Sequence, residues 1–366
     1  MHALEEGGKE APMRMAGRNL TRRQALGAAG LAAASTALAG CSSGGSGSSA
    51  GSDASTGSDA GSGSGDLTKV SFVLDYSPNV NHTGIYVADQ KGWFADEGIE
   101  IDIVPVPDDG ADALIGSGGA NLGISYQDVM AASLGSDNPM PYTALCAIVQ
   151  HNTSGIMSRQ DDGITHPAAM EGFRYATWGN PVEQATVKQV MEDDGGDYSK
   201  LELVTYDTDD EVTGLKSDLF DCVWVYEWWA VQNAKLQDYP VNYFSFRDIN
   251  DVFDYYTPVI CGNDDFVKKN GDLVKAFLRA AKKGYEYAAE NPADAASILC
   301  DAVPELDKDL INAAQADLSP YYISDASSWG QIDESRWSAY YQWLDDNGLV
   351  ANKIDPKGGY TLDYLE

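Results

Sequence analysis

Residues 75–83, with the sequence DYSPNVNHT, combine groups that could bind a flat polar ring. The face of Tyr76 can stack on such a ring, Asp75 can accept hydrogen bonds, and the Asn79 amide offers both a donor and an acceptor. The same residue types also form ordinary turns and helix caps, because Asp, Ser, Pro and Asn all favour them. The segment is therefore compatible both with a ligand loop and with a purely structural turn.

A second segment, residues 177–183 (TWGNPVE), joins a predicted strand to a predicted helix. Free backbone N–H groups at a helix start favour anions, but one glycine and the early Glu183 argue against a strong phosphate site. Glu183 either accepts a hydrogen bond from an amino group of a ligand or stabilises the first helical turn. Both roles remain open.

A third segment, residues 224–229 (WVYEWW), holds four large aromatic side chains within six residues. The alternation of a strand places Trp224 and Tyr226 on one face, with Trp228 beyond the end of the strand. Aromatic walls with a few polar groups are typical of a pocket for a flat ring. This segment therefore predicts a ring-binding surface.

The sequence offers little for catalysis or for a metal. His82, His151 and His166 are isolated, and the Ser, Cys and His residues fall into no known catalytic spacing. The glycine run at 116–119 lacks the flanking residues of a nucleotide-binding loop, and CxxC and HExxH motifs are missing. From the residues alone we expect no enzyme, no metal and no cofactor.

The chain has 366 residues, and its 56 acidic and 24 basic side chains give a formal net charge of −32. This charge argues against nucleic acid, whose phosphates attract clustered Lys and Arg, and against electrostatic adhesion to anionic lipid. At about 100–200 residues per domain, the length suggests two domains.

Residues 1–40 have the pattern of an export signal, with a basic segment before a short, weakly apolar stretch. The arginine pair at 22–23 is compatible with twin-arginine export and with an ordinary Sec signal. The sequence LAGC ends at Cys41 and resembles a bacterial lipobox, in which the cysteine is lipidated. Residues 42–65 contain only Ser, Gly, Ala, Asp and Thr and predict a flexible tether. We therefore expect an exported protein that is lipid-anchored at the outer face of the cell membrane.

From residue 66 onward, predicted strands and helices alternate and must position the three ring-binding segments. Strands are expected at 70–74, 101–106, 122–126, 142–149, 173–177, 201–205, 222–226 and 241–246. Helices are expected at 83–97, 182–193, 265–300, 307–318 and 334–347. Such alternation predicts an α/β fold with a mostly parallel sheet, in which ligands lie beyond the carboxyl ends of the strands.

The run from Val73 to Ala88, followed by KGWF at 91–94, resembles the solute-binding lipoproteins of ABC transporters for thiamine pyrimidine precursors, the NMT1-like family. These proteins are related to the hydroxymethylpyrimidine phosphate synthases. The first motif of the family reads LDW-x-PN-x-NHTG, and here Tyr76 replaces its tryptophan. Further matches follow in order and cover nearly all of 69–365: ISYQ at 124–127, GNPVE at 179–183, YYTPV at 255–259, KGY at 283–285, NP at 291–292 and YTLDYL at 360–365.

The resemblance implies a type II periplasmic-binding-protein fold, with two α/β domains joined by a hinge. Domain 1 would comprise residues 66–153 and 256–366, and domain 2, inserted into it, residues 154–255. In this family a pyrimidine lies between aromatic rings and is held by an asparagine and by acidic groups. Carried over to this chain, the ligand-binding set is Asp75, Tyr76, Asn79, Gln127, Trp178, Glu183, Trp224, Tyr226, Asp254 and Tyr256.

The function implied by the resemblance is to bind hydroxymethylpyrimidine, or its formylamino or aminomethyl derivative, and to pass it to a permease with its ATPase subunits for thiamine synthesis. Another flat ligand, such as thiamine, a flavin or a sulfonate, is an alternative. A pyrimidine-forming enzyme is a second alternative. The histidine of the synthases is missing at 128–130, and their Cys-rich stretch is missing at 253–256, which argues against an enzyme.

Overall fold

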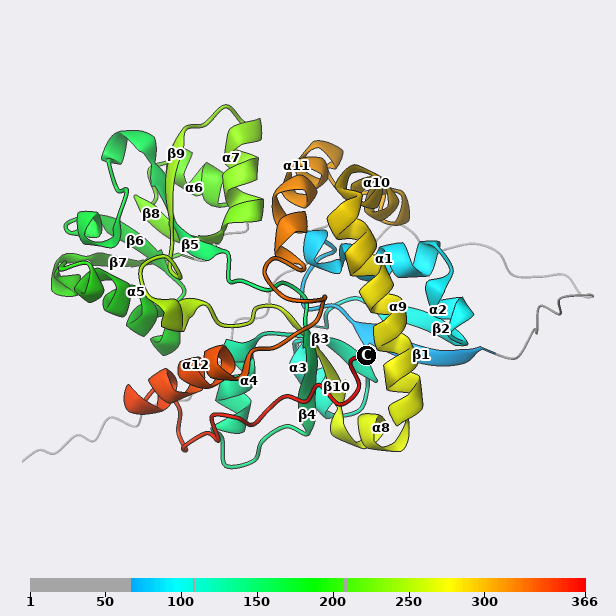
Figure 1. Cartoon of the computed structure of the whole chain (residues 1–366). Helices are drawn as coiled ribbons and strands as arrows, with labels where there is room; N and C mark the ends of the chain where they lie inside the picture. The colour runs from blue at the N-terminus through cyan, green and yellow to red at the C-terminus, as the bar shows by residue number, and fades with distance from the viewer. Residues whose placement is uncertain (1–66, 108, 207–209) are drawn as a thin grey trace, which may run out of the picture. The chain divides into compact units, whose positions relative to one another are not determined.

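The computed structural model describes residues 67–107, 109–206 and 210–366, whose strands form two five-stranded sheets (Figure 1). The predicted signal peptide at 1–40, the lipidated Cys41 and the tether at 41–65 lie outside the described residues. Within the described part of the chain, no helix is long and apolar enough to cross a membrane. The four cysteines of that part are all buried free thiols.

The first sheet has the strand order β2-β1-β3-β10-β4. Its strands are β1 (Thr68–Val73), β2 (Ile99–Val104), β3 (Leu122–Ser125), β4 (Tyr142–Ala147) and β10 (Val259–Asn263). The pairs β2–β1 and β1–β3 are parallel, whereas β10 runs antiparallel to both of its neighbours.

The second sheet repeats this plan in the order β7-β6-β8-β5-β9. Its strands are β5 (Ser154–Arg159), β6 (Arg174–Thr177), β7 (Glu202–Thr205), β8 (Cys222–Tyr226) and β9 (Val241–Ser245). The pairs β7–β6 and β6–β8 are parallel, and β5 is antiparallel to β8 and β9.

The expectation of a mostly parallel sheet needs a correction, because each sheet contains one reversed strand, β5 or β10. Neither β5 nor β10 is among the strands predicted from the sequence. Each follows a segment that carries the chain from one sheet to the other, at 148–153 and 246–258. Their side chains are buried on both faces over nearly the whole strand, so the sequence shows no alternation of polar and apolar residues.

The helices lie close to the predicted positions, but two long stretches that were predicted to be helical each divide into shorter helices. The predicted helix at 83–97 divides into α1 and α2 at Gly92, whose positive φ of 74° ends a helix. The predicted helical range 265–300 divides into α8, α9 and α10; the start of α10 at Pro292 is confirmed, because Asn291-Pro292 predicts a new helix there, whereas the break between α8 and α9 was not predicted. The full set is α1 (Thr83–Gln90), α2 (Trp93–Asp96), α3 (Ala111–Gly116), α4 (Gln127–Leu134), α5 (Pro181–Asp193), α6 (Glu211–Lys216), α7 (Gln232–Leu236), α8 (Asp264–Lys269), α9 (Gly271–Glu290), α10 (Pro292–Ala302), α11 (Lys308–Leu318) and α12 (Glu334–Asp346).

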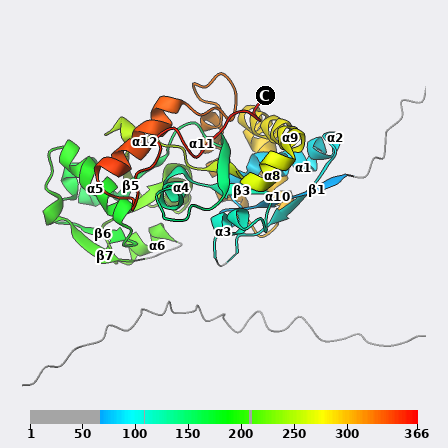
Figure 2. The same ribbon diagram turned by 90° about the horizontal axis from the view of Figure 1, so that it is seen from below.

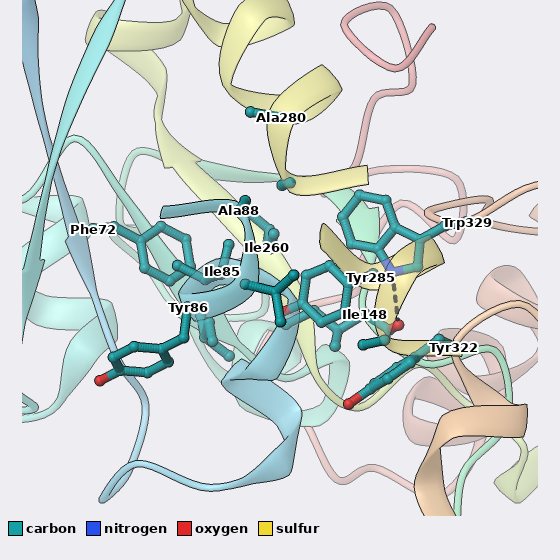
Figure 3. Close-up of a cluster of buried hydrophobic side chains, with 14 of the residues drawn as sticks. Phe72, Ile85, Tyr86, Ala88, Ile148, Ile260, Ala280, Tyr285, Tyr322 and Trp329 are labelled. Carbon is teal, nitrogen blue, oxygen red and sulfur yellow. Dashed lines mark hydrogen bonds between the residues drawn. The ribbon is translucent and has the colours of Figure 1, made fainter. Parts of the chain in front are cut away.

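The long helix α9 covers the first sheet and anchors the largest buried cluster (Figure 3). Its Tyr285 stacks on Trp329 with ring centroids 4.6 Å apart, and the indole Nε1 of Trp329 donates a hydrogen bond to the Ile148 carbonyl at 3.0 Å. Helix α1 packs so tightly on α9 that a Cβ atom added to Gly284 would lie 1.9 Å from the Gly84 carbonyl oxygen. This contact fixes the start of α1, directly after the predicted ligand loop.

Helix α12 packs against the cores of both sheets. Figures 1 and 2 show it beside α4, which follows β3, and beside α5, which follows β6. Trp337 is buried in a core cluster of the first sheet, and Trp343 meets Phe253 of the second sheet's core edge-on at 5.0 Å. The predicted domain boundaries at 153/154 and 255/256 separate the strands of the first sheet from those of the second. The described residues nevertheless form one compact unit, so the division into two domains stays a prediction.

Candidate functional site

The predicted ligand loop after β1 is closed by a buried histidine. His82 Nε2 lies 2.7 Å from Asp75 Oδ1, and His82 Nδ1 accepts a hydrogen bond from the backbone N–H of Asn79 at 3.1 Å. The hydroxyl of Tyr126, at the end of β3, donates to the other oxygen of Asp75. These contacts hold the buried Asp75 carboxyl group between His82 and Tyr126 and connect the loop to the end of β3.

Within this loop, Asn79 acts as a helix cap. Its Oδ1 accepts from the Asn81 backbone N–H at 2.9 Å, and its Nδ2 donates to the Ser77 carbonyl at 3.0 Å. In the capping box Oδ1 also accepts from the backbone N–H of His82, so both acceptor positions are used and one N–H of Nδ2 is left available. Tyr76, three residues earlier, is 51% exposed. The turn role proposed for the loop is therefore present, and a ligand role for both residues remains a prediction.

A row of aromatic rings lies at the corresponding end of the second sheet. Trp178 is 48% exposed and meets Trp224 edge-on at 5.5 Å, and Trp224 packs on Phe246 at 4.3 Å. Tyr226 follows Trp224 on the same face of β8. Trp228 does not belong to this row, because it is buried in the largest core cluster.

Glu183 is buried in the first turn of α5, where both of its carboxylate oxygens have protein partners. The Tyr175 hydroxyl donates to Oε1 at 2.6 Å, and the Thr177 hydroxyl donates to Oε2 at 2.8 Å. Burial raises the pKa of Glu183. A ligand could share these oxygens, since a carboxylate accepts about four hydrogen bonds.

Three other predicted residues hold protein segments together. Gln127 donates to the Trp337 carbonyl at 2.8 Å and accepts from the Tyr256 backbone N–H at 2.9 Å. Asp254 accepts from the guanidinium of Arg336 at 2.8 Å, and the Tyr256 hydroxyl accepts from Arg336 as well. These polar groups connect the crossing segment 246–258 to α12, and their ligand roles stay predictions that the contacts do not support.

Two polar cavities flank Arg336. One, of about 510 Å³, is lined among others by Arg247, Asp251 and Asp254, and the other, of about 450 Å³, by Tyr256 and several acidic and amide side chains. Of the ten predicted ligand residues, only Asp254 and Tyr256 line them. The exposed rings of Tyr76 and Trp178 therefore lie outside these two cavities.

Asp128 and Tyr126 are not among the ten predicted ligand residues. They lie between the predicted site residues of the first sheet and those of the second. Asp128 lies in the first turn of α4, its Oδ1 is buried without a hydrogen-bond partner, and burial raises its pKa from 3.8 to about 6. Burial raises the pKa of Tyr226, and the nearby charges of Asp128 and Asp75 raise it further. The Tyr226 hydroxyl also lies 3.3 Å from the Thr257 hydroxyl. The acids that follow β1 and β3 thus lie near enough to Tyr226, at the end of β8, for their charges to act on its hydroxyl.

The signals for these two residues were present in the sequence. Tyr126 stands in the matched motif ISYQ, and Asp128 lies in the segment 128–130, where the synthase histidine is missing. Their contacts with Asp75 and Tyr226 join residues far apart along the chain, so no local pattern could show them.

The histidines of the described residues are each paired with carboxylates. Besides His82 with Asp75, His166 Nδ1 lies 2.5 Å from an Asp194 oxygen, and His151 contacts two aspartates. The described part of the chain contains no group of three or more His, Cys, Asp or Glu side chains that could hold a metal ion.

A sequence model of the family described as NMT1/THI5 like matches residues 79–295. The chain belongs to this family. It is 28% identical over 302 residues to the formylaminopyrimidine-binding protein of Halalkalibacterium halodurans, covering 81% of this chain and 90% of that protein. It is 25% identical over 313 residues to the 4-amino-5-hydroxymethyl-2-methylpyrimidine phosphate synthase THI11 of Saccharomyces cerevisiae, covering 81% and 88%.

Solved structures identify the fold of this NMT1/THI5-like protein. The periplasmic aliphatic sulphonate binding protein SsuA from Escherichia coli matches with a TM-score of 0.65 at 13% identity, over 81% of this chain and 99% of that chain. The alkanesulfonate-binding protein SsuA from Xanthomonas axonopodis pv. citri, bound to MOPS, matches with a TM-score of 0.62 at 9% identity over the same shares. The predicted periplasmic-binding-protein fold is confirmed.

Proposed function

We propose that this chain is an extracytoplasmic solute-binding protein that takes up a thiamine pyrimidine precursor for an ABC importer. The preferred ligands are formylaminopyrimidine and hydroxymethylpyrimidine. The observation that carries the proposal is the combination of exposed rings, Tyr76 and Trp178, with a buried carboxylate oxygen of Asp128 that has no hydrogen-bond partner in the protein. The relationship to a formylaminopyrimidine-binding protein over 90% of its length supports the same ligand class.

Each group of the site has a defined task in this proposal. The pyrimidine stacks against Tyr76 on the side of the first sheet and against Trp178 and Trp224 on the side of the second. The unpartnered Asp128 Oδ1 accepts a hydrogen bond from the amino group of the ring, and the remaining N–H of Asn79 Nδ2 donates to a ring nitrogen. Because the ligand contacts groups at both sheets, its binding favours the closed arrangement.

We propose binding rather than synthesis, although the family includes synthases. A catalytic histidine needs a ring nitrogen free for the substrate. Both ring nitrogens of His82, and both of His151, are engaged by protein groups. The segment 128–130, where the synthase histidine is missing, carries Asp128, whose carboxylate can accept a hydrogen bond from an amino group.

The remaining parts of the proposal concern location and delivery. We propose that residues 1–40 direct export, that a lipid on Cys41 anchors the protein at the outer face of the membrane, and that residues 42–65 tether the binding body to it. A permease with ATPase subunits receives the ligand.

A ligand panel tests the proposed function. Isothermal titration of the purified chain, unfolded and refolded to remove bound ligand, should show tight binding of formylaminopyrimidine or hydroxymethylpyrimidine. Thiamine, flavin mononucleotide and an alkanesulfonate should bind at least tenfold more weakly. Tight binding of one of these three and none of a pyrimidine would overturn the proposal. Appearance of hydroxymethylpyrimidine phosphate in amounts larger than that of the protein would show an enzyme instead.

A further inference from the structure

The ring of His82 has only one arrangement of protons that fits its neighbours. The Asn79 backbone N–H can only donate, so Nδ1, 3.1 Å away, must be an unprotonated acceptor. Nε2 therefore carries the proton and donates it to Asp75 Oδ1 at 2.7 Å. The side chain is fully buried, so no water competes for either bond. The geometry assigns a neutral imidazole with its proton on Nε2.

The base of the loop is fixed independently of His82. The Val80 carbonyl accepts from the Tyr322 hydroxyl at 2.6 Å, and the Asn81 carbonyl accepts from the Tyr285 hydroxyl at 2.8 Å. Both tyrosines belong to the buried cluster on α9 and its neighbours (Figure 3). The backbone directly before His82 is therefore held in place, and the His82 ring contacts the earlier residues Asp75 and Asn79.

The part of the loop that would touch the ligand depends on this ring. Tyr76 is exposed, and Asn79 is held at its backbone N–H by His82 Nδ1. The Asn79 side chain contacts only its own loop, at Ser77 and Asn81. The Asn79 carbonyl and Oδ1 accept from the backbone N–H groups of His82 and Asn81, and the His82 ring adds the one side-chain bond that holds the Asn79 N–H to the base.

We propose that His82 is a positioning residue for ligand binding, which holds Asn79 and the segment carrying Tyr76 in place without touching the ligand. This inference rests on the proposed function and deepens it. A preformed loop avoids the loss of conformational freedom that a mobile loop suffers on binding, and that saving appears as affinity. The Asp75 contact orients the ring, whereas the Asn79 contact does the positioning.

Two substitutions test the contact of His82 with Asn79 and its contact with Asp75 separately. His82→Asn places an amide acceptor near the position of Nδ1 and keeps the bond to Asn79, but it is too short to reach Asp75. His82→Gln reaches Asp75 with its amide N–H and leaves the Asn79 N–H without a partner. We expect His82→Gln to weaken binding of the pyrimidine that binds wild type by about tenfold, the effect of one unpaired buried donor. We expect His82→Asn to bind within threefold of wild type.

Hydrogen–deuterium exchange of the ligand-free chain gives a readout that does not depend on the ligand. The peptide covering residues 75–82 should exchange faster in His82→Gln and at the wild-type rate in His82→Asn. His166→Gln, which removes a partly exposed partner of Asp194, is the matched control and should change neither exchange nor affinity.

The outcomes distinguish the inference from the function on which it rests. If wild type binds no pyrimidine, the proposed function fails, and exchange in the loop still decides the role of His82. If both His82 variants lose affinity only in proportion to a lower melting temperature, His82 is merely structural. If neither variant changes exchange or affinity, or if nitrogen NMR of the wild-type imidazole finds the proton on Nδ1, the inference is overturned.

Discussion

Trp178 is an exposed ring whose removal should affect binding far more than folding. It is 48% exposed and lies against Trp224, so Trp178→Ala takes little apolar surface out of the core. If the ring stacks on the ligand, its loss should cost about 1–2 kcal/mol of binding free energy, roughly a 5- to 30-fold weaker dissociation constant. Isothermal titration with the best-bound pyrimidine measures this change.

A control on the same sheet makes the Trp178 result specific. Leu203 is 41% exposed on β7, and Leu203→Ala should leave affinity and melting temperature close to wild type. Equal affinity of Trp178→Ala and wild type would remove Trp178 from the site.

Asp128 predicts how stability changes with pH. Burial raises its pKa from 3.8 to about 6, so the folded chain binds a proton there more tightly than the unfolded chain. The contribution of Asp128 to stability is therefore greatest below about pH 4 and falls as pH rises to about 6. Above pH 6 the charged carboxylate destabilises the fold by up to about 3 kcal/mol. Asp128→Asn should reduce this loss, as urea unfolding at pH 5 and pH 7 would measure.

The comparison needs an exposed acid as its control. Asp96→Asn changes the same charge at an exposed position of α2 and should leave the pH profile as in wild type. A profile of Asp128→Asn that follows the wild-type slope between pH 4 and 6 would contradict the assignment. We also expect Asp128→Asn to weaken pyrimidine binding, since an amide is a poorer acceptor for the amino group.

Residue types and local spacing identified part of the site, and contacts distant along the chain decided the rest. The exposed rings of Tyr76 and Trp178 lie in the segments selected from the sequence. The partners of Glu183 and Gln127 could not be predicted, because a carboxylate or an amide bound by protein looks the same in a sequence as one free for a ligand. Gln127 bonds to Trp337, 210 residues away.

At the scale of elements, a substitution at Gly284, where α9 contacts α1, has two opposing effects on stability. Replacing a helical glycine by alanine usually stabilises a helix by about 1 kcal/mol. At Gly284, however, the new Cβ would lie 1.9 Å from the Gly84 carbonyl oxygen, a backbone atom that cannot turn aside. We expect Gly284→Ala to lower the free energy of unfolding by about 2–3 kcal/mol, because the helices must separate.

Urea unfolding of two variants checks this prediction. Glu290→Ala introduces the same side chain at an exposed position of α9 and should change stability by less than about 0.5 kcal/mol. A Gly284→Ala protein as stable as wild type would show that the helices can move apart freely.

Helices and strands could be predicted from the sequence where one face is buried and the other exposed, and could not where both faces are buried. Helix α12 shows buried residues at helical spacing (Trp337, Tyr340, Tyr341 and Leu344) and lies within one residue of its predicted end. Strands β5 and β10 are buried on both faces and carry no such pattern. Their reversed direction follows from the path of the chain between the sheets, which local sequence does not record.

At the scale of the whole molecule, the proposed anchor gives a prediction about location. Cys41→Ser removes the sulfur that would carry the lipid and should move the protein from the membrane fraction to the soluble fraction of the host cell. Ser42→Ala, at the neighbouring position, should leave it with the membrane. Immunoblotting of fractionated cells measures both, and a Cys41→Ser protein that stays with the membrane would disprove lipidation at this residue.

The position of β4 has a consequence for the order in which the protein can be assembled. In the first sheet β4 pairs with β10, and its Ala144 forms a bridge with Tyr360. A ribosome makes β4 more than a hundred residues before either partner, so β4 leaves the ribosome with no strand to join. All five strands of the second sheet are synthesised in between. The first sheet, although begun first, is completed last, and a chain released early by the ribosome would leave β4 as an open edge for quality-control proteases.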